Sequence, residues 1–175
     1  MKEIIQNCSP TLAGIKCAGL VSLKLTRGDI DRINRAFSGK GLFAETVRES
    51  CGRSVVLIYR PSQLEKLLEQ SGIRAFLSKC GYDDFSLSGV LKRLKERMRE
   101  QDFPHEVGLI LGYPLEDVEG FIKNGGKDFL LCGYWKVYSD AKAKKAIFDK
   151  YRLCTDIYTK LYALGIGLSQ LAVAA

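Results

Sequence analysis

The chain has 175 residues, a formal net charge of +7 at pH 7, 46% apolar residues and 27% charged residues. This length and composition predict a single globular domain over 1–175 with a sizeable core, and they exclude a disordered or fibrous chain. The moderate positive charge permits an acidic partner or nucleic acid without requiring either.

Neither end of the chain has the pattern of an export signal or a membrane anchor. The sequence opens without the charged and then apolar segment of a signal peptide. The apolar tail, 161–175, is interrupted by glycines and is too short to span a bilayer. We therefore expect a cytoplasmic protein with no membrane span, whose tail packs as a terminal helix on its own copy or on a second one.

The cysteine pattern favours free thiols. The six cysteines are Cys8, Cys17, Cys51, Cys80, Cys132 and Cys154. They form no Cys-x-x-Cys pair, which zinc and iron–sulfur sites usually contain, so we expect reduced thiols and no metal site. A metal held by distant cysteines together with His105 is the alternative. The cofactor stays unknown, because the sequence lacks the GxxxxGK[S/T] and GxGxxG phosphate-binding patterns.

Helix and strand signals mix irregularly through the first part of the chain. Ser9 followed by Pro10 predicts a helix that begins there, with Ser9 as its cap. Asp29 has the position of a second cap, and Pro61 that of the first residue of a further helix. Three runs have the residues and spacing of strands: 18–25, 42–48 and 53–60.

A basic helix is predicted over 86–100, with Ser86 or Ser88 as its cap. Its apolar residues form one stripe that we expect to pack on the core. Its basic residues lie on the other faces: Lys92, Arg93, Lys95, Arg97 and Arg99. Such a run is usually a solvated face, so nucleic-acid binding through it is possible but not favoured.

Residues 104–124 have the spacing of a helix-turn-helix-like corner, which is two short helices joined by a tight turn. Gly108 falls where the helices approach each other, and Gly112 falls where the chain must turn. Pro114 suits the first turn of the second helix. For 107–111 the alternative is a short buried strand, which periodicity does not distinguish from a helix over so few residues.

The second helix of this corner does not have the charge of a DNA-reading helix. Its exposed positions are predicted to carry Glu116, Asp117 and Glu119, which would repel phosphates. We therefore interpret the corner as structural and these carboxylates as a solvated face.

The end of the chain predicts a fourth strand and a long terminal helix. The run 129–138 has the pattern of a strand, and Asp140 is positioned to cap the helix that follows. Together with the earlier runs, this gives an α+β fold in which a small, mostly antiparallel sheet of about four strands is covered by several helices.

Four blocks of the sequence look like a set from one known family. They are CSPTLAGIK at 8–16, FPHEVG at 103–108, LGYPLEDV at 111–118 and CGYWKVY at 132–138. Over nearly its whole length, the chain resembles a family of short bacterial proteins, mainly of anaerobic Gram-positive species, catalogued as a domain of unknown function. The resemblance implies a stand-alone cytoplasmic domain, and an anaerobic source would fit the free use of cysteine. It implies no activity or catalytic residue.

An enzymatic hypothesis pairs Cys8 with His105 in a cysteine-dependent hydrolase or transferase. A helix N-terminus near the cysteine would stabilise its thiolate, and a histidine within reach would take its proton. Glu106 or Asp117 would orient the imidazole, and Lys16 or backbone N–H groups would stabilise an oxyanion. The alternative makes Cys8 a small core residue and His105 part of a helix start.

A binding hypothesis rests on the aromatic residues of the predicted strand 129–138. In a strand, Tyr134, Lys136 and Tyr138 share one face, and this face could stack a planar ligand and hold its phosphate. The alternative makes Trp135 a core anchor. The predicted ligand-binding residues are Lys16, Tyr113, Tyr134, Trp135, Lys136 and Tyr138.

These patterns rank a small-ligand or protein-binding, regulatory module first. The cysteine-dependent enzyme ranks second and a nucleic-acid-binding protein third. No diagnostic motif decides between an enzyme and a binding protein, so that choice, the ligand and the oligomeric state stay open at this point.

Overall fold

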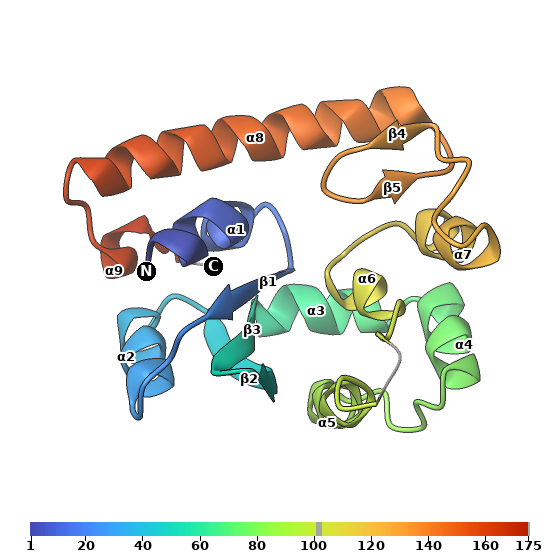
Figure 1. Ribbon diagram of the computed structural model, residues 1–175, viewed down its shortest axis with the longest axis horizontal. Coiled ribbons are helices and arrows are strands. Elements are labelled where there is room, and N and C mark those ends of the chain that lie inside the picture. The colour runs from blue at the N-terminus through green and yellow to red at the C-terminus, as the bar shows by residue number, and fades with distance from the viewer. Residues whose placement is uncertain (101–102, 175) are drawn as a thin grey trace.

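The computed structural model describes residues 1–100 and 103–174 and has the predicted α+β fold (Figure 1). Strands β1 (Ala18–Leu23), β2 (Phe43–Ser50) and β3 (Arg53–Tyr59) form an antiparallel sheet in the order β1-β3-β2. The turn between β2 and β3 consists of Cys51 and Gly52, with φ angles of 50° and 71°. Positive φ at both positions is typical of the two-residue hairpin turns that match the twist of the strands.

Helices cover both faces of this sheet. They are α1 (Lys2–Leu12), α2 (Asp29–Ala36), α3 (Pro61–Leu68), α4 (Ser71–Lys79), α5 (Leu87–Arg97), α6 (Val107–Ile110), α7 (Leu115–Lys123), α8 (Ala141–Ala163) and α9 (Leu168–Leu171). The long helix α8 lies along the top of the molecule in Figure 1, with α1 packed beneath it. Within the described residues, no helix is long and apolar enough to cross a membrane.

Two apolar cores lie on opposite faces of the sheet, because side chains alternate along its central strand, β3. Leu57 points into the core built with α3 to α7, whereas Val56 and Ile58 point into the core built with α1, α2 and α9. Leu168 and Leu171 of α9 are buried in this second core. The part of the apolar tail that forms α9 therefore packs on its own copy of the chain.

The predicted fourth strand, 129–138, is instead a separate small hairpin of β4 (Leu131–Cys132) and β5 (Lys136–Val137). Trp135 and Val137 pack with Phe148 of α8 in a third apolar cluster. The strand prediction was wrong because the apolar residues of this run anchor a hairpin on a helix and do not extend the main sheet.

The corner predicted at 104–124 is confirmed as two helices, α6 and α7, and the alternative of a short strand is wrong. Gly108 lets the two helices approach, since a Cβ there would lie 3.0 Å from both the Tyr113 and the Val118 side chains. Gly112 has a φ of +77°, the left-handed conformation that glycine adopts at little cost.

Helix α1 begins at Lys2, so the predicted start at Ser9 was wrong. Pro10 lies inside this helix, where a proline removes a backbone hydrogen bond. Ser9 is buried and donates its hydroxyl to the Ile5 carbonyl instead of capping the helix. The apolar face of α1 fills the core on one side of the sheet, and this burial stabilises the helix despite the proline.

Arg60 joins four segments at the junction of β3 and α3. It is 1% exposed, and its guanidinium donates to the carbonyls of Thr11 and Leu12 at 2.8 Å each. It also donates to the carbonyls of Val173 at 2.8 Å and Lys40 at 3.3 Å. Its charge therefore lies at the C-terminal end of α1, where the helix dipole favours a cation.

Replacing Arg60 by methionine should lower the free energy of unfolding by about 3 kcal/mol or more, because two buried carbonyls of α1 and two partly buried carbonyls of other segments lose a charged donor. The matched control is Arg35→Met, an exposed position in the last turn of α2, with an expected change below about 0.5 kcal/mol. Urea unfolding followed by circular dichroism measures both. Equal effects of the two substitutions would contradict the role of Arg60.

Candidate functional site

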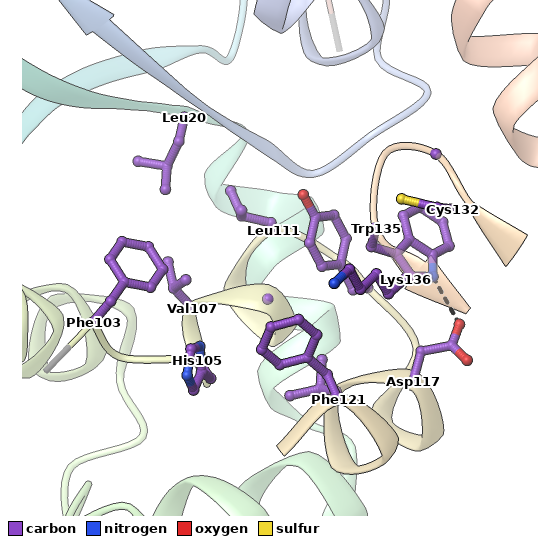
Figure 2. Close-up of a pocket in the computed structure, with 14 residues that line it drawn as sticks. Leu20, Phe103, His105, Val107, Leu111, Asp117, Phe121, Cys132, Trp135 and Lys136 are labelled. Carbon is purple, nitrogen blue, oxygen red and sulfur yellow. Dashed lines mark hydrogen bonds between the residues drawn. The ribbon is translucent and has the colours of Figure 1, made fainter. Parts of the chain in front are cut away.

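A pocket of about 360 Å³ lies between the α6–α7 corner, strand β1 and the β4–β5 hairpin (Figure 2). This volume is at the small end of the range for small-molecule sites. The side of the pocket next to the core is apolar and includes Leu20, Val107, Leu111 and Val118. The corner and the hairpin, which are separate in the sequence, therefore enclose one space.

Aromatic rings form much of the pocket wall. His105 lies between Phe103 and Phe121, with ring centroids 6.2 Å and 4.9 Å away, and meets Phe121 edge-on. On the hairpin side, Tyr113 stacks on Trp135 with centroids 4.9 Å apart. Figure 2 shows Phe103, Phe121 and Trp135 around the same space, each from a different segment. Rings arranged in this way accept a planar molecule by stacking or edge contacts.

Asp117 fastens the hairpin to α7. It is 1% exposed, and its carboxylate accepts the indole N–H of Trp135 at 2.7 Å (Figure 2). It also accepts the backbone N–H groups of Tyr138 at 2.8 Å and Ser139 at 3.2 Å. The Tyr138 ring consequently packs directly on Gly120 of α7, where an added Cβ would lie 2.5 Å from the ring. The prediction that Asp117 belongs to a solvated face was wrong.

Lys136 supplies a positive charge at the pocket. Its ammonium donates to the Gly126 carbonyl at 2.7 Å and lies 5.0 Å and 5.7 Å from the ring centroids of Phe129 and Phe121. An ammonium has three N–H donors, and the described contacts of Lys136 use one of them. Among the described residues that line the pocket, Asp117 is the only acidic one, and its oxygens are occupied. Lys136 is therefore the charged group of the pocket that has hydrogen-bonding capacity left for a ligand.

Tyr113 and Lys16 lie beside each other at the hairpin side of the site. The Lys16 ammonium is 5.1 Å from the centroid of the Tyr113 ring, but Lys16 does not line the pocket. Burial lowers the pKa of Lys16 and raises the pKa of Tyr113 to about 12. Tyr113 is therefore a neutral phenol at physiological pH, able to donate or accept a hydrogen bond.

The structure gives Cys8 the environment of a core residue. It lies in the C-terminal half of α1, so the expected stabilisation of a thiolate by a helix N-terminus is absent. It is 0% exposed, and burial raises its pKa to about 12. His105 borders a pocket on the other face of the sheet. Within the described residues, no cluster of His, Cys, Asp or Glu side chains is arranged to hold a metal ion.

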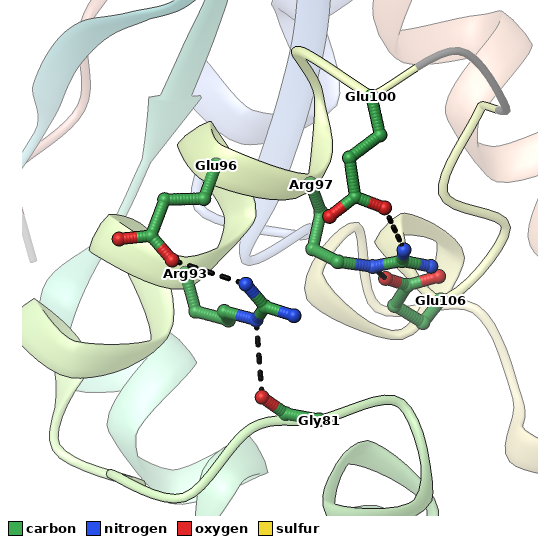
Figure 3. A network of polar contacts seen from close by, with 6 residues as sticks. All are labelled: Gly81, Arg93, Glu96, Arg97, Glu100 and Glu106. Carbon is green, nitrogen blue, oxygen red and sulfur yellow. Dashed lines mark hydrogen bonds and ion pairs between the residues drawn. The ribbon is translucent and has the colours of Figure 1, made fainter.

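Glu106 is bound by Arg97 of α5. Glu106 is 3% exposed and accepts the Arg97 Nε–H at 2.8 Å (Figure 3). Arg97 also pairs with Glu100, and the hydrogen bond that it donates to Glu106 is the main reason that the pKa of Arg97 is raised. These contacts fasten the end of α5 to the segment before α6. Glu106 is thus engaged in a structural ion pair and makes no described contact with the His105 ring.

The predicted basic helix is α5, and the Ser86 side chain caps it as expected. Much of its charge is neutralised inside the chain. Arg93 pairs with Glu96 at 3.1 Å (Figure 3), and Lys95 pairs with Glu45 of β2. Because nearby carboxylates compensate these cations, α5 presents less positive potential to phosphates than its sequence indicates.

Tyr134 and Tyr138 do not line the pocket. Tyr134 packs against Phe148 and Tyr151 of α8, with ring centroids 5.8 Å and 5.3 Å apart. Tyr138 packs against Gly120, and its hydroxyl is buried without a partner among the described residues. Because the hairpin turns between β4 and β5, the predicted aromatic–lysine–aromatic face does not form.

Sequence reasoning did not assign Phe103 or Phe121 to the site, and it gave Asp117 other roles, as part of a solvated face or as a partner of the imidazole. Phe121 follows Val118 at helical spacing, so its place on the apolar side of α7 was visible in the sequence. Asp117 had no local signal, because the N–H groups that it accepts lie 18 to 22 residues further along the chain.

Replacing Asp117 by asparagine should lower the free energy of unfolding by about 1–3 kcal/mol, because the amide cannot accept all three N–H groups and its NH₂ adds a competing donor. Trp135 is the only tryptophan, so loosening of the hairpin should also shift tryptophan emission to longer wavelength. The control is Glu119→Gln on the exposed face of α7. An Asp117→Asn protein with unchanged stability and emission would refute this account.

The thiols should differ sharply in reactivity. With iodoacetamide at pH 8, the exposed Cys51 and Cys132 should be alkylated first, and Cys8 should react only when the protein unfolds. Peptide mass spectrometry after timed quenching measures the order, and a urea-unfolded sample serves as the control in which all six react. Rapid alkylation of Cys8 in the folded protein would instead support the thiol enzyme.

Comparison with known proteins finds one family model that matches nearly the whole chain. No curated protein and no solved structure matches the chain. A family model described as "Protein of unknown function (DUF3793)" matches residues 4–172. The match includes every segment that forms the pocket, so the pocket is built from the family's own domain. The chain belongs to the DUF3793 family.

Proposed function

We propose that the chain is a small-ligand-binding module whose pocket takes a planar molecule with an acidic group. The observation that carries the proposal is the composition of the pocket. Aromatic rings and apolar side chains line it, the Lys136 ammonium lies at it, and its one described carboxylate, Asp117, is already occupied.

The rings select the shape of the ligand. Phe121 and His105 come from the corner, while Trp135 comes from the hairpin, so the pocket has aromatic groups on more than one side. A flat molecule can make stacking or edge contacts with each of them, which adds to the gain from removing its apolar surface from water. A bulky aliphatic molecule would gain the second contribution but not the first.

Lys136 selects the charge of the ligand. Its contacts with Phe121, Phe129 and the Gly126 carbonyl restrict the ammonium before any ligand arrives, so little further ordering is needed. A carboxylate can then form a charge-assisted hydrogen bond in a partly apolar environment, where such bonds are stronger than in water. A cation would find no unoccupied carboxylate among the described lining residues and would meet the Lys136 ammonium instead.

Three probes of one shape test this proposal: 2-naphthoate, neutral 2-naphthamide and cationic 2-naphthylmethylamine. Isothermal titration calorimetry should rank their affinities in that order. Lys136→Met keeps most of the side-chain stem and should weaken 2-naphthoate binding about tenfold or more, with little effect on 2-naphthamide. The matched control is Lys123→Met, an exposed lysine in the last turn of α7, which should bind like the unmodified chain.

Two results would overturn the proposal. One is equal affinity for the three probes, because the charge of the pocket would then be irrelevant. The other is 2-naphthoate binding that Lys123→Met weakens as much as Lys136→Met does, because general surface charge would then explain the binding.

A further inference from the structure

An apolar stripe runs along the outer face of α8. Its members are Leu153, Ile157 and Leu161 of α8 and Leu164 at the C-cap of the helix. They are 62%, 47%, 36% and 79% exposed and recur at intervals of four, four and three residues. At about 100° per residue, these positions fall on one side of the helix. The opposite side of α8 packs on α1 and on the β4–β5 hairpin.

The described chain leaves this stripe uncovered. In Figure 1 α8 is the outermost element along the top of the molecule, and the chain after it turns back beneath it to form α9. Single exposed leucines are ordinary on protein surfaces, but a row of three leucines and one isoleucine along a helix and its C-cap is typical of a contact surface.

We propose that this stripe pairs with the same stripe of a second copy, with the two α8 helices antiparallel across a two-fold axis. The intervals between the four residues of the stripe are nearly the same when they are read from either end. When a second helix runs in the opposite direction, Leu153 faces Leu164 of the second copy and Ile157 faces Leu161 of the second copy. A two-fold interface requires such self-complementarity, in which each contact occurs twice.

Charge favours the antiparallel direction. Asp156 and Lys160 lie one turn apart along the same edge of the stripe. The point midway between them along the helix nearly coincides with the point midway between Leu153 and Leu164. The ion pairs of α8 within the described residues involve Lys144, Lys145, Asp149 and Arg152, and leave these two side chains unpaired.

In an antiparallel pair of helices, equivalent edges meet. Asp156 of each copy then lies beside Lys160 of the other, which gives two favourable ion pairs across the axis. In a parallel pair, the edge that carries Asp156 meets the opposite edge of the other copy, and this complementarity is lost. Charged residues beside an apolar seam set partner and orientation in this way in coiled coils.

The oligomeric state of the full chain tests the proposal. Sedimentation velocity from micromolar to hundreds of micromolar should show a monomer–dimer equilibrium. Ile157→Asp should shift the equilibrium to monomer, because it would bury a carboxylate at the axis. Thr159→Asp is the control, since it makes the same charge change two residues along on the same helix but off the stripe. A chain that stays monomeric, or a dimer that Ile157→Asp leaves intact, would overturn the proposal.

A charge exchange tests the direction of the helices. Asp156→Lys places two lysines together across the axis, and Lys160→Asp places two aspartates together, so each alone should weaken dimerisation several-fold. The double variant restores opposite charges and should recover the dimer. Failure of the double variant to recover it, with circular dichroism showing intact helices, would rule out the antiparallel arrangement.

Discussion

The carboxylate of Asp117 is the interaction on which the candidate site depends. A buried carboxylate is costly unless hydrogen-bond donors surround it, and here the donors are the Trp135 indole and two backbone N–H groups of the segment after the hairpin. These bonds decide where the hairpin lies relative to α7. The same bonds occupy the oxygens of the acidic group at the pocket and leave Lys136 as the charged group that is available to a ligand. One interaction therefore sets both the shape and the electrostatic character of the pocket.

The sheet supports this site from a distance through a second buried charge. Arg60 binds the carbonyls at the end of α1 and near the C-terminus, which fixes the layer on one face of the sheet. Leu20 of β1 contributes to the pocket on the other face. Because β3 packs into both apolar cores, it links the layer that Arg60 fastens to the layer that carries the pocket.

Local patterns predicted the elements well but not their long-range partners. The three strands of the main sheet, the Ser86 and Asp140 caps and the Gly112 turn each have a signal in a few neighbouring residues, and the structure has all of them. One local prediction was wrong: Asp29 is the first residue of α2 and accepts hydrogen bonds from Thr26 instead of capping the helix. The other errors concern distant contacts. Pro10 was read as a helix start because the core that stabilises α1 includes residues from distant parts of the chain. The run 129–138 was read as a strand because no neighbouring residue showed that its apolar side chains would pack on α8.

The two proposed surfaces use different parts of α8 and can be separated by experiment. Phe148 and Tyr151, on the inner side and nearer the N-terminal end, support the hairpin that carries Lys136. The outer stripe begins at Leu153 and continues to the far end of a helix about 35 Å long. A second copy on this stripe would leave the pocket-lining residues uncovered by the contact itself. Dimerisation and ligand binding are therefore distinct properties, and a change at Ile157 should leave binding at the pocket intact.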